Sequence, residues 1–228
     1  MKTLKTVLIL VLTTATMMAQ NTTPQPTIDV KGEGIVKVVP DEVTINIRVE
    51  NTGENTKKLK ELNDETISEV LKFLKKMNVD DKDVKTEYMN LNKNYDYNTK
   101  TYTFAANQSL SIKLRDLNKY EAVMKGLIDT GINRIDGVAF STSKKEALES
   151  QARKKAVENA QLKAKEYTSV LNQTIGKAVS ISEFSSSAGP QPMYKMAMMD
   201  SSSGGGEQTI ALGEIEIKTT VTVSFLLN

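Results

Sequence analysis

Apolar residues recur at every second position in several separate stretches of the 228-residue chain, and this alternation limits the folds open to it. The pattern runs over residues 28–38 and 43–49, and it returns over 104–114 and 215–225. A period of two predicts strands with one buried face. Pro40-Asp41 separates the first two stretches and predicts a β-hairpin over 28–49. A polar tip at 92–100 predicts a second hairpin, from Val84 to Leu114.

Three further segments have helical spacing. Over about 55–77, apolar positions three and four apart stand among Lys and Glu, which predicts an amphipathic helix ended by Asn78. A short helix is expected at about 117–130, stopped by Gly131, and a long helix at about 144–171. Strands at about 132–142 and 177–185 complete the order ββαββ-αβαββ. Hairpins in place of strict β-α-β alternation favour an α+β fold, with a largely antiparallel sheet and amphipathic helices on one face.

The first 19 residues have the pattern of a signal peptide. Lys2 and Lys5 precede a short apolar run, and the small residue Ala19 stands at the expected cleavage position. The run is far shorter than a membrane-spanning helix; an uncleaved anchor or a buried strand is the alternative interpretation. We expect a periplasmic or secreted protein with a signal peptide at 1–19, a polar leader at 20–27 and an α+β domain at 28–228. Two sub-modules are expected, at about 28–115 and 116–228, and no transmembrane segment in the mature chain.

The chain has no His and no Cys. These absences exclude disulfides, zinc-thiolate sites, thiolate nucleophiles, imidazole ligands and the Ser-His-Asp triad. No pair of carboxylates stands in an apolar setting that would separate their pKa values. We therefore predict no catalytic residue and no cofactor, and we expect the protein not to be an enzyme. A Ser, Thr or Lys nucleophile stays open as the alternative.

Charge and aromatic content bear on the partners. Residues 1–19 hold two of the 30 basic residues and none of the 28 acidic ones, so their removal leaves a formally neutral chain. Neutrality argues against a nucleic-acid partner. Aromatic residues make up 5% of the chain, which disfavours large stacking platforms for bases or sugars.

Two short motifs resemble ligand sites without meeting their requirements. Residues 31–34, Lys-Gly-Glu-Gly, lie within a predicted strand and lack the Gly and Lys pattern of a phosphate loop. Gly in a strand instead indicates a bulge or a close approach by another chain. Asp80, Asp81 and Asp83 lack the Gly and the distal Glu of a calcium loop. They predict a solvated turn before the strand at Val84.

The predicted long helix carries a ridge of small residues. Alanines stand four positions apart at Ala152, Ala156, Ala160 and Ala164. Such a ridge lets a helix lie close to the sheet or to another subunit. Basic residues of the same helix are interleaved with Glu, which is typical of a solvated, ion-paired face and not of a nucleic-acid footprint.

A low-complexity segment at 185–208 is expected to form a long flexible loop. It contains four methionines within seven positions: Met193, Met196, Met198 and Met199. Thioethers are soft ligands for Cu(I), and exposed methionines are reversibly oxidised. We treat these residues as a hypothetical soft-metal or oxidation site. The alternative is an adaptable apolar patch that packs against a neighbour.

From Ile28 to Leu227 the chain resembles the SIMPL-domain family, which includes periplasmic immunogenic proteins and bacterial oxidative-stress-defence proteins. The stretches that carry the resemblance, in order, are Val30-Lys31-Gly32-Glu33-Gly34, Val39-Pro40-Asp41, Asp83-Val84-Lys85-Thr86, Tyr95-Asp96-Tyr97, residues 135–141, Ala152-Arg153-Lys154-Lys155-Ala156, Ile175-Gly176-Lys177 and residues 212–217. One departure is Asn172, where the family usually has Gly after the long helix; Asn tolerates the left-handed conformation required there. The resemblance implies an α+β fold, export and ring-like homo-oligomers, and it supplies no catalytic residue.

The sequence thus predicts a non-enzymatic, exported protein that assembles into a ring-like homo-oligomer and acts in envelope and oxidative stress defence. Two alternatives remain. The protein buffers oxidant or Cu(I) through its Met-rich loop, or it is an enzyme of unknown reaction.

Overall fold

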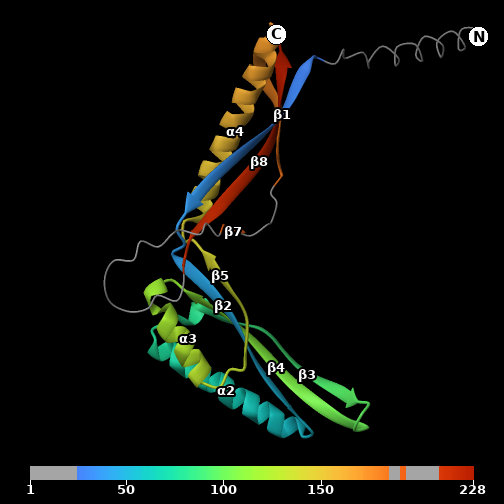
Figure 1. Ribbon diagram of the computed structural model, residues 1–228, viewed down its shortest axis with the longest axis vertical. Helices are drawn as coiled ribbons and strands as arrows, with labels where there is room; N and C mark the ends of the chain where they lie inside the picture. Colours follow the sequence, from blue (N-terminus) through green and yellow to red (C-terminus); the bar gives the residue numbers. More distant parts are fainter. Residues whose placement is uncertain (1–24, 185–190, 194–210) are drawn as a thin grey trace, which may run out of the picture. The chain divides into compact units, whose positions relative to one another are not determined.

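The computed structural model describes residues 25–184, 191–193 and 211–228 (Figure 1). The predicted α+β class is confirmed. The first half of the chain forms β1 (Thr27–Val38), β2 (Glu42–Gly53), α2 (Thr56–Lys76), β3 (Val84–Asp96) and β4 (Thr101–Leu114). The second half forms α3 (Tyr120–Asp129), β5 (Arg134–Ser141), α4 (Lys145–Val170), β6 (Ile175–Phe184), β7 (Gln191–Met193) and β8 (Glu214–Leu227). Single 3-10 turns, η1 (Asp81–Asp83) and η2 (Leu117–Lys119), precede β3 and α3.

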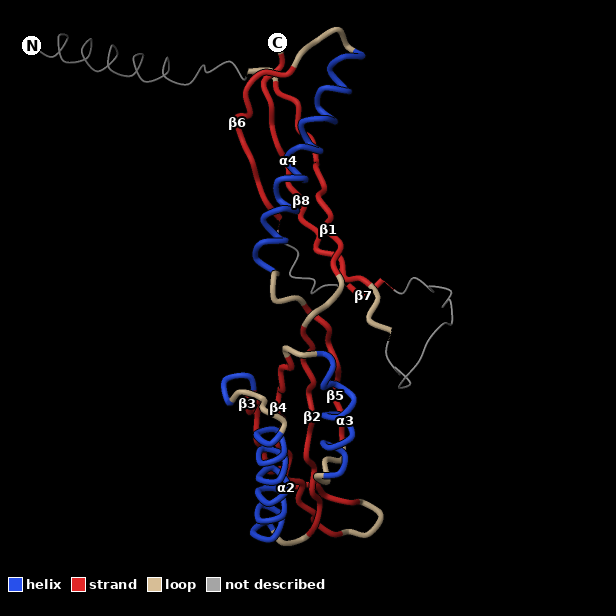
Figure 2. Tube along the Cα trace, turned by 90° about the vertical axis from the view of Figure 1, so that its left-hand side faces the viewer, coloured by secondary structure: helices blue, strands red, loops and turns tan. Residues whose placement is uncertain are grey.

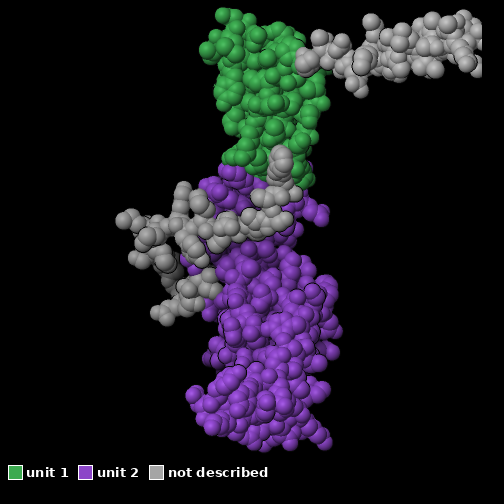
Figure 3. All heavy atoms as spheres, turned by 90° about the vertical axis from the view of Figure 1, so that its right-hand side faces the viewer, with its two compact units in different colours: residues 1–34, 153–185, 219–228 green, residues 35–152, 186–218 purple. Residues whose placement is uncertain are grey.

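The chain divides into two compact units that interleave along the sequence (Figure 3). Unit 1 comprises residues 1–34, 153–185 and 219–228, and unit 2 comprises residues 35–152 and 186–218. The units therefore do not follow the two consecutive sub-modules expected from the sequence. In unit 1 the two ends of the described chain meet, because the Leu227 amide donates to the Pro26 carbonyl at 2.9 Å.

The strands form two sheets, with the orders β1-β8-β6, with β7 also on β8, and β3-β4-β2-β5. The predicted hairpin over 28–49 is wrong, because β1 and β2 belong to different sheets. The connection at residues 39–41 does not return the chain along β1, and β2 pairs instead with β4 and β5. Asp41 instead donates its amide to the Ser141 carbonyl at 3.1 Å, and the chain enters the second sheet beside β5.

The core of unit 2 lies between the β3-β4-β2-β5 sheet and two helices on one of its faces (Figures 1 and 2). The alternation in β2 buries Val43, Ile45, Ile47 and Val49, as predicted for a strand with one buried face. Helix α2 contributes one apolar stripe to this core, and α3 contributes a second. The predicted helix over 55–77 is confirmed: the Asn55 side chain caps its first turn by accepting from the Lys58 amide at 3.1 Å.

The predicted hairpin from Val84 to Leu114 is also confirmed, although its tip is shorter than expected. Cross-strand pairing continues to Asp96 and Thr101, so the turn itself is only residues 97–100. Lys100 closes the turn in the left-handed region, at φ 57°. The long hairpin therefore carries ordered strand structure almost to its end.

Helix α4 covers the sheet of unit 1, and its alanine ridge packs against the sheet. Ala156, Ala160 and Ala164 are fully buried against β1 and β8. A Cβ on Gly32 would lie 2.0 Å from the Ala156 carbonyl oxygen and 2.8 Å from the Ala160 Cβ. The close approach expected at Gly32 is thus made by a helix of the same chain. Of the two roles predicted for the ridge, contact with the sheet is the one observed. Asn172 follows the end of the helix by two residues and has φ 56°, the left-handed conformation that Asn tolerates.

Candidate functional site

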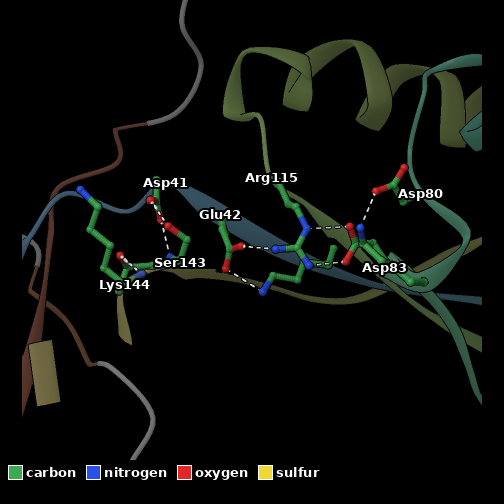
Figure 4. Close-up of polar contacts among 10 residues, drawn as sticks. Asp41, Glu42, Asp80, Asp83, Arg115, Ser143 and Lys144 are labelled. Carbon is green, nitrogen blue, oxygen red and sulfur yellow. Dashed lines mark hydrogen bonds and ion pairs between the residues drawn. The ribbon is translucent and has the colours of Figure 1, made fainter. Parts of the chain in front are cut away.

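One buried carboxylate of unit 2 lies in a network of ion pairs (Figure 4). Glu42, at the start of β2, accepts from Arg115 Nη1 at 3.0 Å and from Lys113 Nζ at 2.7 Å. Arg115 also clamps Asp83, with its Nε and Nη2 each 2.7 Å from one carboxylate oxygen. The network ties β2, the end of β4 and η1 together, and its fork geometry is that of a strong structural ion pair.

The basic side chains of this network favour the ionised form of the Asp83 carboxylate, which accepts their hydrogen bonds. Hydrogen bonds and charge from Arg115 hold the pKa of the Asp83 carboxyl below its ordinary value, despite the opposing effect of burial. Such a group stays ionised at neutral pH and does not act as a general acid. The prediction of a solvated turn at residues 80–83 fits the exposed Asp80 and Asp81 but is wrong for Asp83, because Arg115, which directly follows β4, binds its carboxylate.

A second polar cluster joins the connection that precedes β2 to the connection that follows β5 (Figure 4). The Asp41 carboxylate accepts from the Ser143 amide at 2.7 Å and from the Ser143 hydroxyl at 2.6 Å. These bonds hold the pKa of Asp41 below its ordinary value. The Thr142 hydroxyl accepts from the Lys144 amide at 3.2 Å just before α4. This cluster also orders backbone and presents no free base.

The most unusual surface of unit 1 is the outward side of α4. The helix buries its alanines and exposes larger apolar side chains, a reversal of the usual arrangement. The exposed apolar residues are Val157, Leu162, Tyr167 and Val170 of α4, and Leu171, which directly follows the helix. The neighbouring edge strand β6 has no buried residue within the described part of it, and its Val179 and Ile181 are exposed. We call these seven residues the α4–β6 surface.

Unit 2 leaves one edge of its sheet bare. Of the 13 residues of β3, only Val84 is partly buried, and Met89 is 62% exposed. A groove of about 630 Å³ runs between α2 and the start of β3, with Ile67, Leu74 and Val84 among its apolar lining. Beyond it, the end of the hairpin carries three exposed tyrosines, Tyr95, Tyr97 and Tyr102.

The family model described as "SIMPL: Protein of unknown function (DUF541)" matches residues 28–225. The chain belongs to the SIMPL family. It is 26% identical over 205 residues to the "Uncharacterized protein YggE" of Escherichia coli K12, covering 89% of this chain and 83% of that protein. It is 28% identical over 216 residues to the "26 kDa periplasmic immunogenic protein" of Brucella melitensis, covering 90% and 86%. The YggE protein of Edwardsiella ictaluri is 23% identical, covering 94% and 92%.

The structure places the residues that were singled out in this SIMPL chain as follows. Met193 ends β7, while Met196, Met198 and Met199 lie outside the described residues. Residues 31–34 lie within β1, as expected for a strand. Within the described ranges, no group of three acidic side chains is placed to hold a metal ion. None of the helices described is both long and apolar enough to cross a membrane.

Two features of the SIMPL chain were missed by the sequence analysis. The first is the set of exposed apolar residues of α4, which lie outside the alanine ridge. Their exposure can be predicted from the sequence once the ridge is known to face the sheet. Tyr95 and Tyr97 were noted only within a stretch that carries the family resemblance, and their grouping with Tyr102 was missed because the low aromatic content is an average over the chain. Their register across the predicted hairpin would have brought Tyr95 and Tyr102 together.

Proposed function

We propose that this SIMPL protein is exported, has no catalytic activity, assembles into a ring-like homo-oligomer and acts in envelope defence against oxidative stress. Export is supported by the signal-like pattern of residues 1–19 and by the periplasmic relative from Brucella. The observation that carries the proposal of assembly is the α4–β6 surface, where a helix turns its large apolar side chains outward.

Exposed apolar side chains of this number on one helix and its neighbouring strand are typical of a contact surface. Helix α4 places small side chains inside unit 1, so its larger ones contribute nothing to that core. Burial of such side chains against another chain gains about 25 cal/mol per Å² of apolar area. The charged residues between them include both signs, Lys163 and Glu166 among them, which favours contact between identical copies over contact with a strongly charged partner.

A ring requires two different complementary surfaces on each copy. The β1-β8-β6 sheet has two different edges, at β1 and at β6. Pairing of β6 from one copy with β1 of the next would extend the sheet from copy to copy and bring successive α4 helices together. Unpaired edge strands readily form such contacts.

The absence of catalysis is supported by the state of three carboxylates in unit 2, of which Glu42 is buried and Asp41 and Asp83 are partly buried. Glu42 and Asp83 are each bound by basic side chains, and Asp41 is bound by Ser143. All three serve the fold through bonds that a substrate would have to break.

The test of assembly is the mass of the mature protein in solution, by light scattering at micromolar concentration. We expect several times the mass of one chain. Ile181→Lys should dissociate the assembly, because it places a charge in the apolar contact. Ile128→Lys is the matched control: Ile128 is 59% exposed and Ile181 is 58% exposed, but Ile128 lies on α3 of unit 2. A monomeric wild type, or an unchanged mass for Ile181→Lys, would contradict the proposal.

The test of the stress role is survival of peroxide by cells that lack the gene. Wild-type protein and Ile128→Lys should restore survival, whereas Ile181→Lys should not. Restoration by all three would show that assembly is not needed for defence, and restoration by none would remove the stress role.

A further inference from the structure

Four of the seven tyrosines of the chain lie on the β3–β4 hairpin. Three of them stand at its far end, and none of these three belongs to the core of unit 2. Tyr97 is 84% exposed and Tyr102 is 55% exposed. Exposed ring surface outside the core is available to a ligand. We call Lys93, Tyr95, Tyr97 and Tyr102 the tyrosine platform.

The rings of the platform contact one another. The Tyr95 ring centroid lies 5.0 Å from that of Tyr97, edge to face, and 4.8 Å from that of Tyr102. Tyr95 and Tyr102 are direct cross-strand partners, so the sheet fixes their spacing. The Lys93 ammonium lies 3.9 Å from the centre of the Tyr102 ring. Three rings and one ammonium thus form one continuous surface.

The turn that holds the platform is fixed by its own hydrogen bonds. The Asp96 carboxylate accepts from the Asn98 amide at 2.8 Å and from the Thr99 amide at 3.4 Å. These amides hold the pKa of Asp96 below its ordinary value. The hydroxyls of Thr99 and Thr101 are 2.8 Å apart. A platform ordered before a ligand arrives loses little conformational freedom on binding, and tyrosine has only two side-chain torsions to fix.

The charges around the rings argue against two classes of ligand. Residues 92–102 contain Lys93 and Lys100 and a single acidic residue, Asp96, and strands β3 and β4 contain no Arg. Single-stranded nucleic acid requires a basic groove beside its stacking residues. The same segment contains Asn92, Asn94 and Asn98, whose amides are costly to transfer into a bilayer. A hydrated ligand of little net charge fits better.

We propose that the tyrosine platform binds a polysaccharide chain. A pyranose ring has C–H bonds on its faces and hydroxyls around its rim. Its faces stack on the electron-rich faces of tyrosine rings, and its hydroxyls bond to the tyrosine hydroxyls and the Lys93 ammonium. Two glycan sources share this chemistry, an N-acetylated wall polysaccharide and a plain glucan. This proposal does not depend on self-assembly, because the platform lies in unit 2 and the α4–β6 surface lies in unit 1.

The test uses the full mature protein and two β-1,4-linked hexasaccharides, chitohexaose with N-acetyl groups and cellohexaose without them. The chain has no Trp, so tyrosine emission reports binding directly. We expect saturable binding of at least one hexasaccharide, and the preferred one identifies the source. Tyr102→Ala should weaken binding about tenfold, the effect of losing one stacking ring. Tyr102→Phe, which keeps the ring, should stay within about threefold of wild type.

The matched control is Tyr167→Ala, because Tyr167 on α4 is also 55% exposed but lies outside the platform. It should bind as wild type does. Tyr97→Ala should also weaken binding. It replaces Tyr102→Ala in the test if circular dichroism shows that Tyr102→Ala disturbs the hairpin. The proposal is overturned if neither hexasaccharide binds at millimolar concentration, or if Tyr97→Ala and Tyr102→Ala bind normally. Tighter binding of an oligothymidylate than of either sugar would also overturn it and assign the platform to nucleic acid.

Discussion

The two units of this SIMPL protein bury one face of their sheets with different kinds of side chains. Unit 2 packs two helices on four strands, and its core is built from large aliphatic side chains of β2, β4, α2 and α3. Unit 1 packs one helix on its sheet, and its core combines Val and Phe from the strands with three alanines of α4. Unit 2 gains stability from apolar volume, whereas unit 1 depends on close backbone approach. Helix α4 therefore adds little apolar side-chain volume to the core of unit 1, and its larger apolar residues Val157, Leu162, Tyr167 and Val170 remain on the surface.

The largest expected effect is in the core of unit 2. Ile47→Ala should lower the free energy of unfolding by about 4 kcal/mol, because it removes a fully buried side chain and leaves a cavity. Urea denaturation followed by circular dichroism measures the loss. Ile128→Ala, at an exposed position of the same unit, should change the value by less than about 0.5 kcal/mol. Equal losses at the two sites would show that unit 2 is not held by its apolar core.

The next effect tests the close approach in unit 1. Gly32→Ala should cost about 3 kcal/mol, because the new Cβ would overlap the Ala156 carbonyl oxygen, a backbone atom that moves only with the helix. Gly137→Ala in β5 is the matched control, since a Cβ there meets nothing within 4 Å. Thermal unfolding of both variants gives the comparison. If Gly32→Ala is as stable as Gly137→Ala, α4 does not depend on the glycine.

The sequence predicted best what is encoded locally. The helix over 55–77 and the hairpin from Val84 to Leu114 were found because their periodicity and end signals lie within the segments themselves. The partner of β1 could not be found this way, because β8 lies at the other end of the chain and the intervening Pro40 reads as a turn. A close approach at Gly32 was one of two predictions for this residue, but it was expected from another chain, and the approach by α4 could be identified only after the helix was placed on the sheet.

The candidate sites show the same limit. The bond from Arg115 to Asp83 joins residues 32 positions apart, so the carboxylate could not be distinguished from its solvated neighbours in sequence. The α4–β6 surface can be identified only when it is known which side of α4 faces the sheet. The four equally spaced alanines mark one side of the helix, but the sequence alone does not show whether this side contacts the sheet or a second chain.

A smaller effect concerns the polar cluster around Asp41 in unit 2. Asp41→Asn should lower the free energy of unfolding at pH 7 by about 1 kcal/mol, after allowance for partial exposure, because the bonds from Ser143 lose the acceptor charge. The folded-state pKa of Asp41 is lowered. Its stabilising contribution is therefore complete above roughly pH 5 and is lost as the pH falls through about 4 and below.

The variant should consequently approach wild-type stability at acid pH. Urea denaturation across that pH range is the measurement. The control is Asp129→Asn, because Asp129 is an exposed residue at the end of α3. It should change the free energy of unfolding by less than about 0.5 kcal/mol, both at neutral and at acid pH. A constant difference between Asp41→Asn and wild type from pH 7 to pH 3 would mean that the charge of Asp41 does not matter.

The smallest expected effect on stability separates the bare edge of unit 2 from its core. Met89 on β3 is 62% exposed, whereas Met77 and Met124 are partly buried against the core. Peroxide reaches exposed thioethers first, so peptide mapping should show Met89 oxidised before the other two. The sulfoxide should leave the free energy of unfolding within about 0.5 kcal/mol of the untreated value, because Met89 contributes little to the core. Met89→Leu should delay the first oxidation event without changing stability. Equal oxidation rates for all three methionines would show that peroxide reaches the core of unit 2 as readily as its edge strand β3. They would contradict the contrast between a closely packed core and an exposed edge.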